Sequence, residues 1–182
     1  MNPAFRAAYT LDAHPEQAMG LEIIRFSDPD ATETAPALVS IVRPAESQPW
    51  YGEFFGMRTG LTRLAPTTNP HVLFAVASGI GYLVPVDEPD SYTVVSLKPI
   101  IEIQVAEQEG LLICVSLTNI ALIDAARVRW TTHRLAHDGF AEVRLTQSAV
   151  IARYYDPAQS GYVTAVVDLR DGSVLSEVLD DW

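Results

Sequence analysis

Cysteine is nearly absent from this chain of 182 residues, and its scarcity removes one means of stabilisation. Cys114 is the single cysteine, so no disulfide can form within the chain. It lies in the apolar run 111–115, which predicts a small buried side chain rather than a reactive thiol. A chain of this length buries about 70% of its unfolded surface, so we expect it to fold without a disulfide or a metal.

Long hydrophobic runs and a secretory leader are also missing. No stretch approaches the roughly 18 uninterrupted apolar residues that a membrane-spanning helix needs. Residues 1–6 show no basic region followed by an apolar core, as a signal peptide would. A single cysteine is compatible with a reducing compartment. Together these absences predict a cytoplasmic protein that does not enter a membrane.

Basic residues are few. The chain has 12 lysines and arginines against 23 acidic residues, which gives a formal net charge of −11. A field of this sign repels phosphate backbones, so we expect no nucleic-acid partner. The same field favours association with a basic protein or a cation, although solubility alone also explains it.

Recognisable catalytic and cofactor motifs are lacking as well. Gly79 and Gly81 join two expected strands and do not open a helix, so they do not form a phosphate-binding loop. Asp87, Glu88 and Asp90 lack the spacing of a calcium loop and are interpreted as a turn. No serine sits in a Gly-x-Ser-x-Gly elbow. We therefore expect no metal and no cofactor, and we name no catalytic residue.

The segment 130–139 (WTTHRLAHDG) is the best remaining place for chemistry. His133 and His137 are four residues apart, a spacing that brings two ligands to one face of a helix. Here the segment reads as a strand that runs into an Asp-Gly turn, so the helical argument fails. Trp130, His133 and His137 stay as candidates for ligand binding, and surface histidines are the simpler interpretation.

What the sequence does contain is strands. From residue 71 onward, short runs rich in Val, Ile, Leu and Tyr alternate with Gly, Asp, Asn and Pro turns. Short connections predict antiparallel neighbours, and no long segment has the 3.6-residue period of a helix. The expected strands are 71–77, 81–86, 92–97, 100–106, 111–117, 120–123, 128–135, 141–145, 150–155, 162–169 and 173–179.

Residues 1–60 differ from the rest because prolines interrupt them. Short strands are expected at 21–26 and 37–42, and one helical turn at 15–19. The segment 49–60 is dense in aromatic residues and glycines, typical of a loop that closes one end of a core or of a binding surface. Trp50 and Tyr51 are its candidate ligand-binding residues. We expect one domain, 1–182, with a proline-rich section 1–60 and a β-meander core 61–182.

One phrase recurs three times in the core: an apolar strand that ends in aspartate. It reads LVPVD at 83–87, IALID at 120–124 and TAVVD at 164–168, with the aspartates 37 and 44 residues apart. Each copy combines a strand, a turn, the strand that ends in aspartate, a polar turn and a third strand. An aspartate carboxylate can accept a hydrogen bond from a backbone N–H two residues on, so Asp87, Asp124 and Asp168 are expected to close the turns that follow them.

These units resemble the blades of β-propellers of the quinoprotein-dehydrogenase type, whose motif is Ala-x-Asp-x-x-Thr-Gly-x-x-x-Trp. Ala121 and Asp124 lead to Trp130, but the Thr-Gly is absent and the turn is two residues shorter. Asp168 and Gly172 keep the spacing of the motif in the third unit, which has no tryptophan. The resemblance implies blade-like meanders and carries over no cofactor residue. We expect an all-β, mainly antiparallel fold with a short N-terminal extension, arranged as a β-sandwich or a small or incomplete propeller.

These features favour a non-catalytic, cytoplasmic protein-binding domain. One alternative is a small-ligand binder or enzyme with a site near Trp130, His133, His137 and Trp50, which predicts a deep pocket. Another is an acidic inhibitor or immunity-type protein that neutralises a basic toxin. A homo-oligomer held by pairing of edge strands is a further possibility, because open sheets leave edges to manage.

Overall fold

The computed structural model describes residues 6–13, 18, 20–106, 110–124 and 127–180. In this part of the chain, sixteen strands form four sheets of four strands each, and one short 3₁₀ helix, η2 (Pro89–Ser91), follows β7. We name the sheets A to D in chain order. The strands are β1 (Tyr9–Asp12), β2 (Glu22–Phe26), β3 (Leu38–Pro44) and β4 (Trp50–Phe54) in sheet A; β5 (Arg63–Pro66), β6 (Val72–Ala77), β7 (Ile80–Pro85) and β8 (Thr93–Val94) in sheet B; β9 (Glu102–Ala106), β10 (Leu111–Val115), β11 (Ile120–Asp124) and β12 (Arg127–Thr131) in sheet C; and β13 (Phe140–Leu145), β14 (Ala149–Asp156), β15 (Gly161–Asp168) and β16 (Val174–Leu179) in sheet D.

Sheets B, C and D are antiparallel meanders, in which each strand pairs with the next along the chain. Short turns make this the simplest connection. Sheet A has the order β1-β3-β4-β2, and β2 runs parallel to β4. The prediction of an all-β, mainly antiparallel fold is therefore confirmed, and the N-terminal residues add a fourth sheet with its own strand order.

The sheets pack face to face in series, so a hydrophobic cluster lies between each neighbouring pair. Successive residues of a strand point to opposite faces, which lets one inner strand serve two clusters. In β6, Leu73 and Ala75 pack against sheet A, whereas Phe74 and Val76 pack against sheet C. This explains why the inner strands of sheets B and C, β6, β7, β10 and β11, are almost wholly apolar, as the run 111–115 led us to expect.

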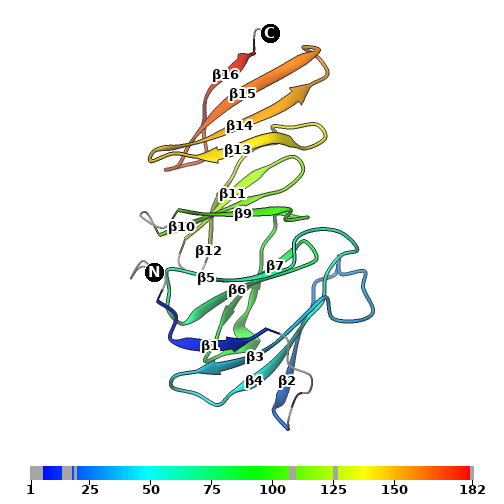
Figure 1. The fold of residues 1–182 in the computed structure, drawn as a ribbon, viewed down its shortest axis with the longest axis vertical. Coiled ribbons are helices and arrows are strands. Elements are labelled where there is room, and N and C mark those ends of the chain that lie inside the picture. The colour runs from blue at the N-terminus through cyan, green and yellow to red at the C-terminus, as the bar shows by residue number, and fades with distance from the viewer. Residues whose placement is uncertain (1–5, 14–17, 19, 107–109, 125–126, 181–182) are drawn as a thin grey trace.

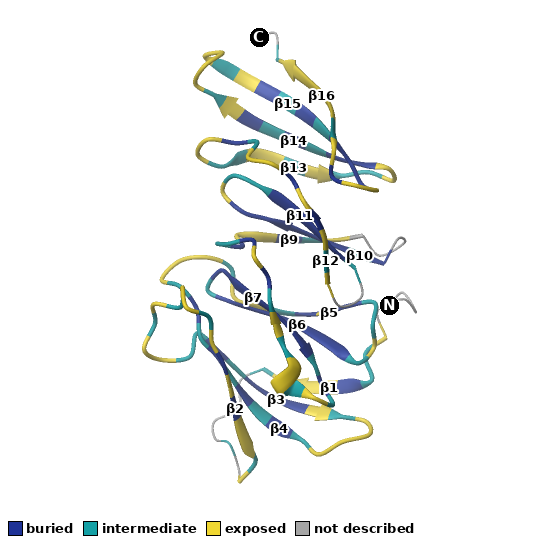
Figure 2. Cartoon of the chain, turned by 180° about the vertical axis from the view of Figure 1, so that it is seen from behind, coloured by how far each residue is buried: buried dark blue, intermediate teal, exposed yellow. Residues whose placement is uncertain are grey.

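Sheets A and D lie at opposite ends of the long axis, and the stack between them is open (Figure 1). The arrangement is a row of blade-like sheets that does not close into a ring, so sheets A and D are each covered by a neighbouring sheet on one face only. Burial follows this arrangement: β6 and β7 are largely buried, whereas most of β16 is exposed (Figure 2).

The three sequence repeats correspond to three sheets, since the units that contain Asp87, Asp124 and Asp168 form most of sheets B, C and D. Some strand predictions were wrong in extent: the expected strand 92–97 is β8, only two residues long, and the expected strand 128–135 ends at Thr131. Strands β1, β4 and β5 were not predicted. The helical turn at 15–19 falls mainly on residues outside the described ones.

The repeated aspartates have different contacts in the three sheets. The carboxylate of Asp168 accepts a hydrogen bond from the backbone N–H of Arg170, at 2.8 Å, as the repeat predicts. Asp87 instead accepts from the side chain of Ser47 and pairs with His71. Asp124 lies 3.7 and 3.8 Å from Arg127 and Arg129 in loose ion pairs. The predicted bond is thus confirmed at Asp168; Pro89 has no N–H to offer Asp87, and residue 126, two positions after Asp124, lies outside the described residues.

Candidate functional site

The aromatic segment 49–60 is part strand and part loop: Trp50–Phe54 form β4, and residues 55–60 contain no strand. Trp50 and Phe54 point into the cluster between sheets A and B, where the indole N–H of Trp50 donates to the carbonyl of Val86 at 2.9 Å. Tyr51 is half-buried and lies on the other face of sheet A. Gly52 sits between the two buried rings, because a side chain there would lie within 3 Å of both.

Trp130 and the two histidines belong to the opposite half of the molecule. Trp130 is buried between sheets C and D, and its indole N–H donates to the carbonyl of Leu169 at 2.9 Å. His133 and His137 are exposed, and Arg134 contacts the Nδ1 atom and the carbonyl oxygen of His137, both at 3.1 Å. The structure therefore does not gather the five predicted ligand-binding residues into one place.

A shallow pocket of about 250 Å³ opens at the edge of sheet A, and none of those five residues lines it. Its walls are small and mostly apolar, and they come from the N-terminal segment and the end of β3: Ala7, Ala8, Tyr9, Thr10, Arg43 and Ala45. Such a pocket offers one cation and no converging set of polar groups, so it does not resemble an enzyme site.

Ser47, Asp87 and His71 form a contact that superficially suggests a catalytic triad. The hydroxyl of Ser47 donates to one carboxylate oxygen of Asp87 at 2.9 Å, and Nδ1 of His71 lies 2.8 Å from the other. In a nucleophilic triad the imidazole stands between the hydroxyl and the acid, so that it can take the hydroxyl proton. Here the carboxylate stands in the middle, so the arrangement joins the β3–β4 connection to sheet B and does not activate the serine.

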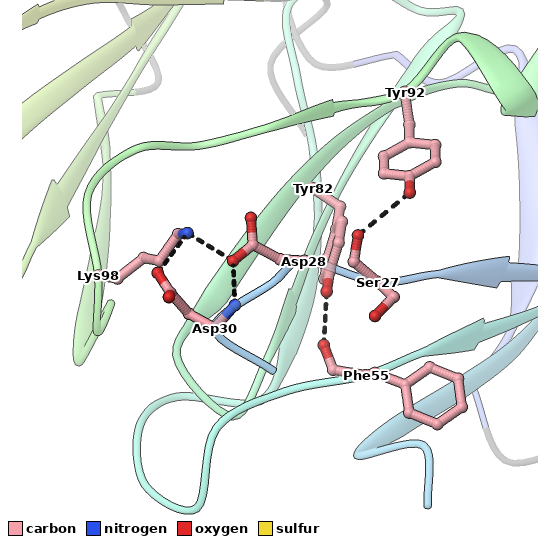
Figure 3. A network of polar contacts seen from close by, with 7 residues as sticks. All are labelled: Ser27, Asp28, Asp30, Phe55, Tyr82, Tyr92 and Lys98. Atoms are coloured by element: carbon pink, nitrogen blue, oxygen red, sulfur yellow. Dashed lines mark hydrogen bonds and ion pairs between the residues drawn. The ribbon is translucent and has the colours of Figure 1, made fainter. Parts of the chain in front are cut away.

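Lys98 is the only lysine of the chain, and it sits between two aspartates (Figure 3). Its ammonium donates to Asp28 at 2.6 Å and to Asp30 at 3.0 Å, and the backbone N–H of Asp30 also donates to Asp28. Burial alone would raise the pKa of Asp28, but the hydrogen bonds from Lys98 and Asp30 and the charge of Lys98 together lower it.

Burial would likewise lower the pKa of Lys98, but its two carboxylate partners raise it, so the group stays charged. This contact joins the loop after β2 to the segment that leads from sheet B to sheet C. Tyr82 and Tyr92 extend it by donating to the carbonyls of Phe55 and Ser27 (Figure 3). Within the described residues, no buried side-chain nitrogen or oxygen of this cluster lacks a hydrogen-bond partner, so we interpret the cluster as a structural latch.

Metal and thiol chemistry find no support in the described residues. Within that part of the chain, no three His, Cys, Asp or Glu side chains come together as metal ligands would. Cys114 is buried, as predicted, and burial raises the pKa of its thiol to about 12. No helix among the described residues is long and apolar enough to span a membrane.

The outer face of sheet D, which faces away from sheet C, is the most distinctive surface of the molecule. Strand pairing places its side chains in three rows, one that runs from β14 to the residue after β16 and two that run from β13 to β16. The rows contain Tyr155, Tyr162 and Asp180; then Glu142, Arg153, Thr164 and Val178; then Arg144, Ile151, Val166 and Ser176.

The centre of this face is held in place by contacts within the sheet. Arg153 donates to Asp180 at 2.6 Å and lies 4.3 Å above the centre of the Tyr162 ring. Tyr155 meets Tyr162 edge to face, with ring centres 5.7 Å apart, and Thr164 donates to Asp180 at 2.8 Å. The hydrogen bonds from Arg153 and Thr164 lower the pKa of Asp180. The two tyrosines are therefore oriented before any partner arrives.

This fixed face also remains accessible. Tyr155, Tyr162 and Val178 are 48%, 37% and 59% exposed. Large, pre-oriented aromatic side chains beside an arginine are the composition of protein-binding hot spots. By contrast, on the outer face of sheet A the side chain of Ile41 is buried, so that end of the stack is already partly covered.

Sequence reasoning missed both the latch and this face, although each had a signal. The sequence shows that Lys98 is the sole lysine of the chain. Its contact with the aspartate-rich segment after β2, however, can be seen only once the fold is known. Strands 150–155 and 162–169 were predicted, and their short turn already places Tyr155 beside Tyr162. The missing information was which of the four sheets has an uncovered face.

Comparison with known proteins adds little to this description. No protein-family model and no curated protein matches the sequence. Among solved structures, the fold is similar to the crystal structure of the N-terminal domain of Nup159, with a TM-score of 0.43 and 10% sequence identity. The match covers 95% of this chain, which spans about half (51%) of that one. The fold is therefore described by the arrangement of its four sheets and not by membership of a family.

Proposed function

We propose that this chain is a non-catalytic protein-binding domain and that the outer face of sheet D is its binding surface. The observation that carries the proposal is the exposed pair Tyr155 and Tyr162, oriented by Arg153 and Asp180 on a face that no other sheet covers. Order in the free state favours binding, because less side-chain freedom is lost when a partner arrives.

The charge of the chain suggests the kind of partner. The net charge is −11, yet the proposed face carries two arginines, Arg144 and Arg153, and two acids, Glu142 and Asp180. The excess negative charge therefore lies around the face and not on it. A partner with an apolar contact area and a basic surrounding surface would fit both features, and the long-range field would speed its approach.

The proposal can be tested by affinity capture followed by binding measurements on the captured protein. Tyr155→Ser and Tyr162→Ser each remove a central aromatic ring, and we expect each to weaken binding roughly 10- to 100-fold, as loss of a hot-spot residue does. Ile23→Ser is the matched control, since Ile23 is 49% exposed on the outer face of sheet A. If both tyrosine variants bind the partner with the affinity of the wild-type chain, or if only the Ile23 control loses binding, this surface is rejected as the binding face.

Salt gives an independent readout. If the partner is basic, its affinity falls as ionic strength rises, because salt screens the attraction to a chain of charge −11. An affinity that is unchanged or improved by salt would contradict the proposed charge of the partner, although it would leave the binding face in place.

A further inference from the structure

β16 is the least protected edge strand of the described sheets. Exposed sheet edges invite pairing with other chains, and proteins usually discourage it with very short strands, prolines or charged side chains. Here β8 has two residues, and six other edge strands carry charged side chains: Asp12 in β1, Arg25 in β2, Arg63 in β5, Glu102 in β9, Arg129 in β12 and Arg144 in β13.

β16 (VLSEVL) is six residues long and carries a single charge, which is turned away from the edge. The carboxylate of Glu177 accepts a hydrogen bond from the Tyr154 hydroxyl at 2.6 Å, on the inner face of the sheet. Leu175, Val178 and Leu179 are 60%, 59% and 42% exposed. An apolar strand of this length with a free edge is suited to adding another strand.

The register of β16 against β15 fixes which backbone groups point outward. The N–H of Asp180 donates to the carbonyl of Tyr162, so the backbone of Asp180 faces β15. Orientation alternates along an antiparallel edge, so Val178 also faces β15, whereas the N–H and C=O groups of Glu177 and Leu179 point away from the sheet. These groups are the ones that an added strand would bond.

We propose that β16 pairs antiparallel with β16 of a second copy of this chain, about a two-fold axis at Val178. In this register Glu177 pairs with the second copy's Leu179, and Leu179 with its Glu177. The two reciprocal pairs would form about four backbone hydrogen bonds. Val178 meets its own counterpart on the outer face, and no carboxylate stands opposite another.

Two other two-fold registers, centred on Glu177 and on Ser176, are less favourable. An axis at Glu177 would place two glutamates directly opposite each other, and like charges in that position destabilise a sheet. An axis at Ser176 would use Leu175, which occupies the irregularity where β16 shifts its register against β15. The strand sequence therefore favours the register centred on Val178.

Such a pairing would enlarge the surface discussed above. A two-fold axis perpendicular to the sheet keeps both outer faces on the same side, so the two D sheets would join into one sheet of eight strands. Tyr155 and Tyr162 of both copies would then face the same direction. The inference stands independently of the proposed function, but where both hold, the dimer would present two binding faces to one partner surface.

Charge provides a signature that separates this pairing from partner binding. Two chains of charge −11 repel each other, and salt screens that repulsion. The dimer should therefore tighten as ionic strength rises, whereas a complex with a basic partner should weaken.

Disulfide trapping tests the proposal at residue level. Val178→Cys places two thiols on the axis, where the Cα atoms of a non-hydrogen-bonded pair are about 4.5 Å apart, within disulfide range. In the same register, Ser176→Cys places its two thiols roughly 14 Å apart along the strands. The native Cys114 is buried and does not interfere.

We expect mild oxidation to convert Val178→Cys into a covalent dimer at least about tenfold faster than Ser176→Cys. Leu179→Pro supplies a second test, because it removes an outward N–H and spares the bonds to β15; in sedimentation it should be monomeric under salt conditions where the wild-type chain dimerises. Preferential trapping of Ser176→Cys, or a wild-type chain that stays monomeric at high concentration and high salt, would overturn the proposal. Loss of partner binding in the tyrosine variants while Val178→Cys still cross-links would support both proposals, whereas wild-type binding in the tyrosine variants together with that cross-link would reject the binding face and keep the pairing of β16.

Discussion

Sheets C and D are consecutive copies of one sequence unit, yet they are stabilised differently. In sheet C, Leu112 and Cys114 pack against sheet B, while Ile113 and Val115 pack against sheet D. In sheet D, Val163, Ala165 and Val167 point inward, and the alternate positions of the same strand carry Tyr162, Thr164 and Val166 on an uncovered face.

This difference shows that position in the stack, rather than the repeat itself, decides the role of a strand. An inner sheet gains apolar burial on both faces, at about 25 cal/mol per Å². Sheet D gains it on one face and is free to use the other for contacts outside the chain. Local opening should accordingly be easiest in sheet D and above all in β16.

The largest expected difference between sheets C and D comes from truncating one isoleucine in each sheet. Ile120 is fully buried between sheets C and D, so Ile120→Ala should lower the free energy of unfolding by about 4 kcal/mol through lost burial and a cavity. Ile151 lies half-buried on the outer face of sheet D, so Ile151→Ala should lower it by less than about 1 kcal/mol. Urea denaturation measures both values, and equal losses would contradict the difference between the sheets.

The latch at Lys98 tests whether the other end of the stack depends on charge. Lys98→Met removes the partner of the nearly buried Asp28 and should lower the free energy of unfolding by about 3 kcal/mol. Adding Asp28→Asn should recover part of this loss, because no unpaired carboxylate then remains buried. Hydrogen exchange should increase in sheets A and B but not in β14–β16. An unchanged stability would show that the latch is dispensable.

The junction between sheets C and D depends on Gly172. Its φ is +74°, and a Cβ there would lie 2.7 Å from the Trp130 ring, so Gly172→Ala should lower the free energy of unfolding by about 2 kcal/mol. Gly139→Ala is the matched control, since Gly139 has a φ of +100° and open space around it. It should show only the conformational cost, about 1 kcal/mol. Equal effects would mean that the contact with Trp130 contributes nothing.

Low pH should destabilise sheet D more than sheet C. Hydrogen bonds lower the pKa of four aspartates in sheet D or its turns below the ordinary 3.8: Asp156, Asp168, Asp171 and Asp180. A lowered pKa contributes stability above 3.8 that is lost as the pH falls through the folded-state value. Denaturant midpoints between pH 6 and pH 2 should therefore fall most steeply below about pH 4. Asp180→Asn should flatten that fall, and an unchanged slope would contradict the role of Arg153 and Thr164.

Local sequence patterns predicted most of the strands, and the strands and pairings that they missed have identifiable causes. Alternating apolar runs and Asp-Gly or Asn turns predicted most strands of sheets B, C and D. Strand β4 was missed because Pro49, Gly52 and Gly56 are typical of a loop, although Gly52 is there to admit the rings of Trp50 and Phe54. The parallel pairing of β2 with β4 joins segments separated by β3, and no local pattern specifies it.

The candidate surface was harder to predict from the sequence, for a physical reason. An exposed tyrosine and a tyrosine that packs against a neighbouring sheet look alike in sequence, as Tyr154 and Tyr155 demonstrate. Tyr154 points inward and donates to Glu177, whereas Tyr155 faces solvent. Which face is covered depends on how many sheets stack and in what order, and that is a property of the whole chain.

Hydrogen exchange of the chain with and without its captured partner tests the assignment of the binding face most directly. Binding at the outer face of sheet D should slow exchange in β14, β15 and β16 and leave β2, β3 and β4 of sheet A unchanged. Protection confined to sheet A, or to the Lys98 segment, with none in β14–β16, would contradict it.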